Sequence, residues 1–182
     1  MQKEYDLFLP WESRKHIDIF ARIKPENLFR LNPHWVINSF AQSLDSYATE
    51  ITDHETEKTK SLQGSCSNNG DGFPVVLAEN HDWQSIRFFE KNDSLHVDVS
   101  YREDPSEDVE KHVVLWLRSI REYLRLYTTN SINTRFFRFI MNRVILQMNP
   151  SQRKISLMLI RLTMLEILVI IIIVVGWFFF FR

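Results

Sequence analysis

The 182-residue chain is poor in the residues from which small catalytic and metal sites are built. Cys66 is its only cysteine, which excludes an internal disulfide and every paired-cysteine motif and fits a reducing compartment. With four glycines, the sequence contains no nucleotide-binding glycine motif and no nucleophile elbow. The six histidines form no HExxH motif. We therefore predict no catalytic residue, no metal site and no cofactor.

Two short runs, Asp53-His54-Glu55 and His81-Asp82, place candidate metal ligands next to one another in the sequence. Neighbouring side chains in a strand point to opposite faces, so we interpret both runs as surface polar residues. A cyclase-type enzyme would need polar side chains inside a cavity. The strand near residue 97 offers only His96 or Asp98, on the face opposite its apolar residues, so an enzyme is the least favoured hypothesis.

Acidic residues are almost absent after residue 128. Residues 1–128 contain 22 of the 23 acidic residues and 15 of the 22 basic ones, whereas residues 129–165 contain six basic residues and no acidic one. The acidic first part disfavours nucleic acid as a partner, because it would repel phosphates. The basic second part lies directly before an apolar C-terminal segment, where we expect it to contact anionic membrane lipids.

The C-terminal end of the chain lacks polar side chains. From Ile167 to Phe181 the sequence reads ILVIIIIVVGWFFFF, and extension back to Leu162 gives 20 residues, about 30 Å as a helix. This length predicts one transmembrane helix with aromatic residues at its far interface. The N-terminus has no apolar core of signal-peptide length, so we predict a C-terminal tail anchor.

Basic residues lie almost entirely on the N-terminal side of the predicted span. The positive-inside rule then places the N-terminal domain in the cytoplasm. We expect a single-pass membrane protein, and in a bacterium we expect the inner membrane. The residues expected at the membrane interface are Arg135, Arg138, Arg143, Arg153, Lys154, Arg161 and Trp177.

Two interpretations of Glu166 remain open. It lies at the cytoplasmic interface near Arg161, or it lies a turn inside the bilayer and contacts a partner helix.

The segment before the span, residues 134–148, reads TRFFRFIMNRVILQM and predicts an amphipathic helix. Its apolar face includes Phe136, Phe137 and Ile140, whereas Arg135, Arg138 and Asn142 lie opposite. A basic amphipathic helix beside an anchor is typical of one that lies in the membrane interface. The alternative is a helix packed against the N-terminal domain or against another subunit.

Alternation and turn residues predict the secondary structure of the N-terminal domain. We expect strands at about 15–23, 39–51, 55–63, 73–79, 83–91 and 94–102, a short helix after Pro25, and a brief helix or turn around Trp35. The glycine-rich segment 61–74 reads as an exposed loop. Residues 83–102 predict a hairpin, and Ser106 is placed to cap a long helix whose apolar face continues to Tyr127.

The order of these elements resembles the helix-grip fold of the START-like, polyketide-cyclase-like superfamily. The residues that carry the resemblance are HIDIFARIKPENLFRLNPHW near the start and LHVDVSYREDP before the long helix. It implies an α+β domain over about residues 12–128, in which a curved antiparallel sheet wraps the final helix around a cavity for an apolar ligand. We therefore predict three parts: a START-like domain (1–128), a basic amphipathic neck (129–156) and a transmembrane anchor (157–182).

Two functions follow from these parts. The first is a membrane-anchored module that binds a lipid, a quinone or another apolar molecule at the cytoplasmic surface. The second is an accessory or assembly subunit of a larger membrane complex, with partner subunits and no ligand of its own. For the first function, the residues expected to line the ligand site are Trp35, Val97, Val99, Trp116, Ile120 and Tyr123.

Overall fold

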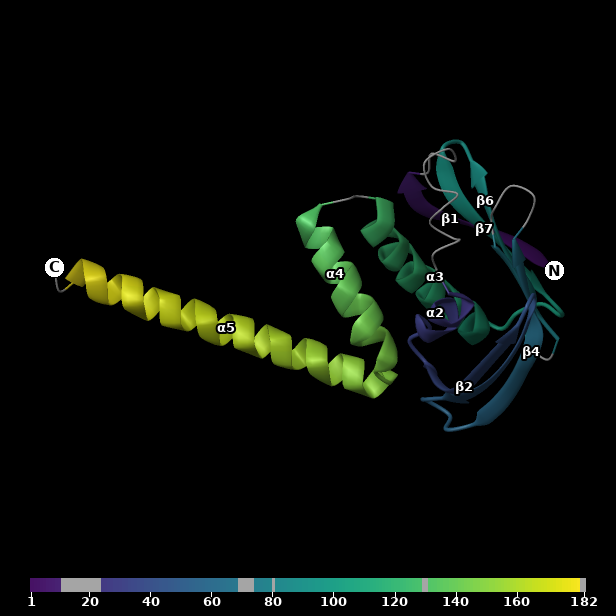
Figure 1. Ribbon diagram of the computed structural model, residues 1–182, viewed down its shortest axis with the longest axis horizontal. Helices are drawn as coiled ribbons and strands as arrows, with labels where there is room; N and C mark the ends of the chain where they lie inside the picture. Colours follow the sequence, from purple (N-terminus) through teal and green to yellow (C-terminus); the bar gives the residue numbers. More distant parts are fainter. Residues whose placement is uncertain (11–23, 69–73, 80, 129–130, 181–182) are drawn as a thin grey trace. The chain divides into compact units, whose positions relative to one another are not determined.

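The computed structural model describes residues 1–10, 24–68, 74–79, 81–128 and 131–180 (Figure 1). Within these ranges the strands form one antiparallel sheet in the order β1-β7-β6-β5-β4-β3-β2. The strands are β1 (Gln2–Pro10), β2 (Trp35–Ser43), β3 (Ser46–Asp53), β4 (Thr59–Asn68), β5 (Pro74–Ala78), β6 (Trp83–Lys91) and β7 (Ser94–Tyr101). The helices are α2 (Pro25–Arg30), α3 (Glu107–Thr128), α4 (Ile132–Arg143) and α5 (Pro150–Phe180), with a 3-10 turn, η1 (Ile145–Gln147).

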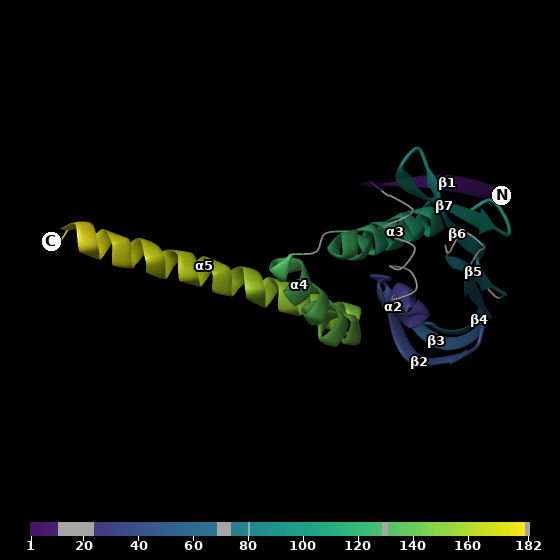
Figure 2. The ribbon, with the colours of Figure 1, turned by 45° about the horizontal axis from the view of Figure 1, so that its top comes forward.

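The sheet curves around α3, as the turned view shows (Figure 2). Irregular register in the β1–β7, β2–β3 and β6–β7 pairs accompanies this curvature, because bulges bend and twist a strand. Leu95, Val97 and Val99 of β7 are fully buried, as are Ile120 and Leu124 of α3. Each such side chain contributes roughly 1.5–3 kcal/mol when buried from water. The core therefore lies between the curved sheet and the apolar face of α3.

Two local features fix the ends of the predicted elements. Asn92 and Asp93 both have positive φ, which is the backbone of a two-residue hairpin turn, and they join β6 to β7. The Ser106 hydroxyl accepts a hydrogen bond from the Val109 N–H at 3.4 Å, at the start of α3. The predicted 83–102 hairpin and the capped long helix are therefore confirmed, and with them the α+β helix-grip architecture.

Other predicted boundaries are wrong. The expected turn around Trp35 is the start of β2, and the single strand expected over 39–51 is two strands separated by Leu44, whose φ is 49°. Part of the expected loop at 61–74 belongs to β4, which pairs with β3 and β5. Strand β1 was not predicted, and the strand expected at 15–23 lies outside the described residues.

The neck helix α4 contacts the rest of the N-terminal unit through its polar side. The Tyr123 hydroxyl donates to the side-chain oxygen of Asn142 at 2.7 Å, and the side-chain nitrogen of Asn142 donates to the Tyr127 hydroxyl at 3.0 Å. The Arg138 guanidinium lies 5.2 Å from the centre of the Tyr127 ring. Phe136, Phe137 and Phe139, in contrast, remain exposed. The side of α4 that packs on the domain therefore combines these polar groups with Met141, whereas the phenylalanines of the predicted apolar face stay exposed.

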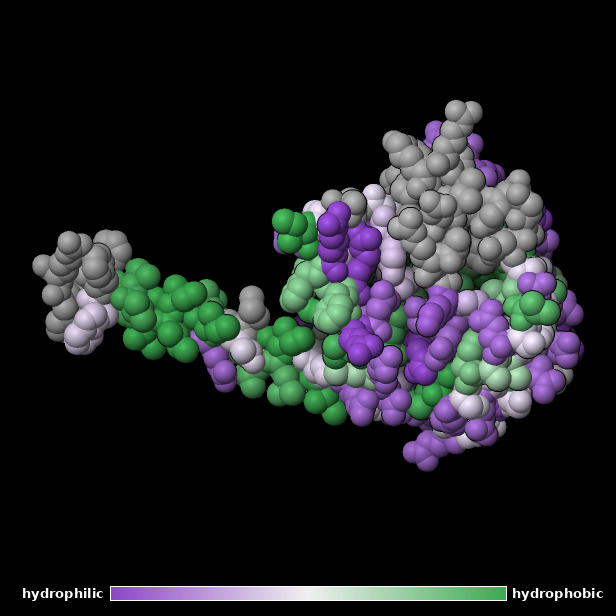
Figure 3. Space-filling model, viewed as in Figure 1, coloured by the Kyte–Doolittle hydropathy of each residue, from purple (hydrophilic) through white to green (hydrophobic). Residues whose placement is uncertain are grey.

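By contacts, the chain divides into two compact units, Met1–Gln147 and Met148–Arg182. The second unit is dominated by α5, and the face of this helix seen in Figure 3 is largely apolar. Over Pro150–Trp177 it is long and apolar enough to cross a membrane, judged by length and composition, and its most apolar stretch is unburied. In the described residues this is the only helix that meets that test. Arg153, Lys154 and Arg161 lie in its first half.

Candidate functional site

A cavity of about 250 Å³ opens between α3 and the β2–β3 and β6 region of the sheet. Its apolar wall comes from strands β2, β3 and β6 and from the first half of α3. The apolar residues that line it are Trp35, Ile51, Trp83, Val109, Val113 and Trp116. The cavity therefore lies where a helix-grip domain encloses space, between the sheet and its long helix.

Three indole rings from different elements meet at this wall. The centre of the Trp116 ring lies 5.2 Å from that of Trp35 and 5.7 Å from that of Trp83. The Trp116 indole nitrogen donates to the Leu28 carbonyl oxygen at 2.7 Å, which ties α3 to α2. Tryptophan buries a large rigid surface with few torsions to order, so these rings form a preorganised apolar surface for a flat or aliphatic ligand.

Polar groups complete the lining. The cavity is also lined by Asn32, Asp53, Thr56, Lys58, Lys60, His81, Asp82 and His112. Among these, the His81 ring packs against the rings of Trp35 and Trp83, at 5.5 Å and 5.2 Å between centres. Burial lowers the pKa of His81 from 6.5 to about 4. Its Nδ1 atom is buried and has no hydrogen-bond partner among the described residues. His81 is therefore a neutral imidazole with one nitrogen free to bond a polar group.

A cluster of two histidines and a glutamate adjoins the cavity. His112 of α3 stacks on His34, with 4.2 Å between ring centres, and both histidines approach the carboxylate of Glu55. Burial, followed by the neighbouring His112, lowers the pKa of His34. Sequence reasoning did not group these three residues, because they come from a loop, a turn and a helix that are far apart in the chain.

The residues predicted to bind a ligand fall into two groups. Trp35 and Trp116 line the cavity. Val97, Val99, Ile120 and Tyr123 lie in the closed core, each at most 1% exposed, and do not line it. Val97 and Val99 are on β7, away from the cavity wall, and Tyr123 lies further along α3, where its hydroxyl bonds Asn142. A ligand-binding role stays a prediction for all six.

Sequence reasoning missed Trp83 and His81 as lining residues. Trp83, Ile86 and Phe88 of β6 are all buried on one face of the strand. A register shift between Trp83 and Ser85 breaks the alternation of apolar and polar residues, so counting every second residue does not place Trp83 on this face. His81 had no periodic signal, since it lies in the connection before β6.

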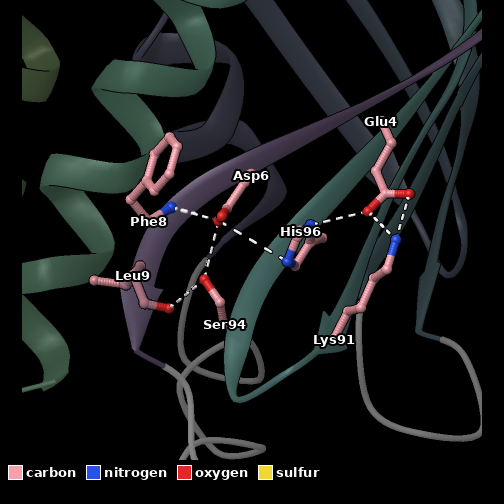
Figure 4. A network of polar contacts seen from close by, with 7 residues as sticks. All are labelled: Glu4, Asp6, Phe8, Leu9, Lys91, Ser94 and His96. Atoms are coloured by element: carbon pink, nitrogen blue, oxygen red, sulfur yellow. Dashed lines mark hydrogen bonds and ion pairs between the residues drawn. The ribbon is translucent and has the colours of Figure 1, made fainter.

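His96 and Asp98, the polar residues considered for an enzyme, are two residues apart on β7 and so share one face of the strand. Figure 4 shows His96 within a polar network between β1 and the β6–β7 hairpin. His96 Nδ1 is 3.0 Å from a Glu4 carboxylate oxygen, and Lys91 donates to the same carboxylate at 2.6 and 2.8 Å. Asp6 accepts hydrogen bonds from the Phe8 N–H and the Ser94 hydroxyl, at 2.7 and 3.0 Å. This network joins β1 to the β6–β7 hairpin and has no access to the cavity wall.

No protein-family model matches the chain, and no curated protein matches it significantly in sequence. Similar solved structures include one from Cytophaga hutchinsonii, at 12% identity and a TM-score of 0.46, covering 72% of this chain and 96% of that one. The AHSA1-like protein from Aeromonas hydrophila is 8% identical, with a TM-score of 0.45 over 70% and 94% of the two chains. Ara h 8.0201 is 11% identical, with a TM-score of 0.42 over 69% and 96%.

These likenesses concern the fold alone. The strand order and the placement of α2 and α3 confirm the resemblance to the START-like superfamily at that level. No ligand, partner or activity is carried over from these proteins to this chain.

Proposed function

We propose that this protein is a membrane-anchored module that binds a small apolar molecule at the cytoplasmic membrane surface. The observation that carries the proposal is the cavity between α3 and the sheet, walled by Trp35, Trp83 and Trp116. The three rings contact one another and belong to the core, so the cavity wall is a continuous apolar surface. Ligand sites in proteins are typically concave, mostly apolar and equipped with a few polar groups.

The dimensions and chemistry of the cavity restrict the ligand. Its volume of about 250 Å³ is slightly below the range of about 300–1,000 Å³ for ligand pockets. A single ring system, such as the head of a quinone, or one end of a lipid chain fits this volume. Polar side chains such as Asn32, Thr56 and Lys60 also line the cavity, so a carbonyl or hydroxyl oxygen on an otherwise apolar molecule matches the lining.

Two features of the chain support placement at a membrane. Helix α5 has 31 residues, which is about 46 Å and exceeds a hydrocarbon core of about 30 Å. Its apolar second half therefore fits the bilayer, while Arg153, Lys154 and Arg161 remain at the cytoplasmic interface with Arg135, Arg138 and Arg143. In addition, α4 presents exposed phenylalanines beside these arginines, as an interfacial helix does.

Tryptophan fluorescence tests the proposal directly. Full-length protein in lipid nanodiscs would be titrated with menadione, a naphthoquinone without a lipid tail, and quenching of the indoles would be followed. Val113 lines the cavity, so Val113→Phe is expected to fill space and weaken saturable quenching at least about tenfold. The matched control is Leu115→Phe, on the same helix at a side chain that is 41% exposed. Equal quenching in both variants would mean partition into lipid, not binding in the cavity.

A second function rests on Glu166, which lies within α5 with apolar residues around it in sequence. A carboxylate inside a bilayer needs a partner, and a helix of another subunit supplies one. Native mass spectrometry after extraction in mild detergent separates the two functions. A chain that carries a stoichiometric apolar molecule supports the binding module. An empty chain that travels with other membrane subunits, and loses them on Glu166→Leu, supports the accessory role.

A further inference from the structure

We propose that His34, Glu55 and His112 bind a divalent transition-metal ion of the zinc type beside the cavity. In the described part of the chain, these are the three residues whose ligand atoms come together, all within 4.8 Å of one another. The proposal does not depend on an apolar ligand, because it rests on a separate set of side chains and is tested with the metal alone.

The distances between ligand atoms are close to those of a zinc site, and one imidazole must rotate out of the stack for both ring planes to contain the ion. The His34 Nδ1 atom lies 3.1 Å from one Glu55 oxygen, and the His112 Nε2 atom lies 3.6 Å from the other. Ligand atoms around a tetrahedral zinc ion, with bonds of about 2.0–2.2 Å, are about 3.4 Å apart. Two histidines and one glutamate form a known zinc-binding set, which leaves a fourth position for water or for a polar group of another molecule.

The backbone holds two of the three ligands in place. The Asn32 side-chain oxygen accepts a hydrogen bond from the His34 N–H at 2.9 Å, and the His34 carbonyl accepts one from His54 at 2.7 Å. The Asp53 carboxylate accepts hydrogen bonds from the Glu55 and Thr56 N–H groups, both at 2.9 Å. These bonds fix the loop before β2 and the turn after β3 side by side. His112 is fixed independently, on the second turn of α3.

The donor atoms favour a transition metal. His34 and His112 contribute imidazole nitrogens from rings whose centres are 4.2 Å apart, and Glu55 contributes carboxylate oxygens. Neutral imidazole is the form that binds metal, and the Glu55 carboxylate supplies a negative charge. Imidazole nitrogens select zinc and its neighbours in the periodic table over Mg²⁺ and Ca²⁺, which prefer oxygen ligands.

Metal binding by the full-length protein in detergent tests the proposal. Zn²⁺ affinity would be measured against a chromophoric chelator in the presence of excess Mg²⁺, and Co²⁺ would be used to detect tetrahedral coordination from its visible absorption. We expect one Zn²⁺ per chain. Glu55→Gln and His112→Gln are each expected to weaken binding at least about tenfold, since they remove ligand atoms from exposed side chains that the fold does not need.

His54→Gln is the matched control, because His54 is an exposed histidine next to Glu55 and lies outside the cluster. It is expected to keep Zn²⁺ affinity within about twofold of the unchanged chain. Circular dichroism without metal would show that each variant is folded. Absence of stoichiometric Zn²⁺ binding by the unchanged protein would overturn the proposal. Equal loss in His54→Gln and His112→Gln would also overturn it, as would equal affinity for Mg²⁺.

Discussion

His81 combines burial, aromatic neighbours and an unpartnered nitrogen in a single side chain. Its ring lies against Trp35 and Trp83, and desolvation is the largest cause of its lowered pKa. The neighbouring Asp82 acts in the opposite direction and does not offset burial. A buried imidazole of this kind stays neutral throughout the physiological range, so it adds a polar group but no charge beside the cavity.

We expect the protein to lose stability on acidification, partly through His81. Its pKa is lowered from 6.5 to about 4 in the folded state, so the unfolded chain binds a proton first as the pH falls. The free energy of unfolding therefore decreases between pH 6.5 and 4, by about 3 kcal/mol at most from this group. His81→Gln, which cannot titrate, is expected to remove that part of the pH dependence. The measurement is denaturant unfolding of Met1–Gln147 at pH 7 and pH 4.5.

Other groups contribute to the same pH dependence, so a control is needed. The pKa of Asp6 is lowered chiefly by its hydrogen bond from the Phe8 N–H, and that of Asp53 by bonds from Thr56 and Glu55, against burial. Both carboxylates also lose stabilising interactions at low pH. An exposed histidine variant, His54→Gln, should keep the full slope between the two pH values. A His81→Gln slope as steep as that of the control would show that His81 is protonated in the folded protein.

Gly64 and Cys66 show that local composition can wrongly predict a loop where the chain forms a strand. Both belong to a run rich in glycine, serine and asparagine that reads as a loop, yet both are in β4. A Cβ at position 64 would lie 1.9 Å from the Leu77 carbonyl oxygen, so glycine is needed there for close approach of strands β4 and β5. Burial raises the pKa of the Cys66 thiol to about 11, which agrees with an unreactive cysteine. Pairing with two neighbouring strands thus overrides a weak local preference.

At the scale of elements, predictability follows the strength of the local signal. The β6–β7 hairpin has alternating apolar residues and two turn residues, and α3 has a cap and about five turns of apolar spacing, so both were predicted. Strands β2 and β3 have many small polar residues, and their break at Leu44 and Asp45 contains neither glycine nor proline. The cavity itself depends on which strands lie beside α3. Sequence reasoning therefore found Trp35 and Trp116 but neither Trp83 nor His81.

We expect α4 to bind anionic lipid through its exposed aromatic side. Met1–Gln147, which forms a compact unit, would be sedimented with vesicles of neutral lipid and of neutral plus anionic lipid. Replacement of Phe136 and Phe137 by serine removes two exposed apolar side chains, 61% and 55% accessible. This double variant is expected to bind anionic vesicles about tenfold more weakly, and binding by the unchanged unit is expected to fall with salt.

The control for this experiment is Phe8→Ser, which removes an aromatic side chain of 75% exposure from β1. Its binding to vesicles should match that of the unchanged unit. If Phe8→Ser weakens binding as much as the double variant does, attraction to lipid is a general property of the surface and α4 is not an interfacial helix.

At the scale of the whole molecule, charge and apolarity are separated along the chain. The first 128 residues hold nearly all of the acidic groups, the next 37 hold six cations, and the last part is the apolar half of α5. An acidic domain is repelled by an anionic leaflet, whereas the cations before the span are attracted to it by about 1 kcal/mol each. For the proposed membrane anchor, this separation of charge predicts that the domain stays on the side where the cations are held.

We expect this signal to determine the topology of the protein in a bacterial inner membrane. In inverted membrane vesicles, external protease should digest the N-terminal domain, and in intact spheroplasts the domain should be protected. Neutralising the three cations of α5 (Arg153→Gln, Lys154→Gln, Arg161→Gln) should reduce the protected fraction in spheroplasts, because the charge difference across the span is smaller.

The control is a triple variant on the exposed side of α3 (Lys111→Gln, Arg118→Gln, Arg125→Gln). It removes the same charge at positions far from the span in the sequence, so it should leave the protected fraction unchanged. Equal effects of the two triple variants would mean that total charge, and not its position beside α5, decides orientation. A domain digested from outside in intact spheroplasts of the unchanged protein would contradict the cytoplasmic placement.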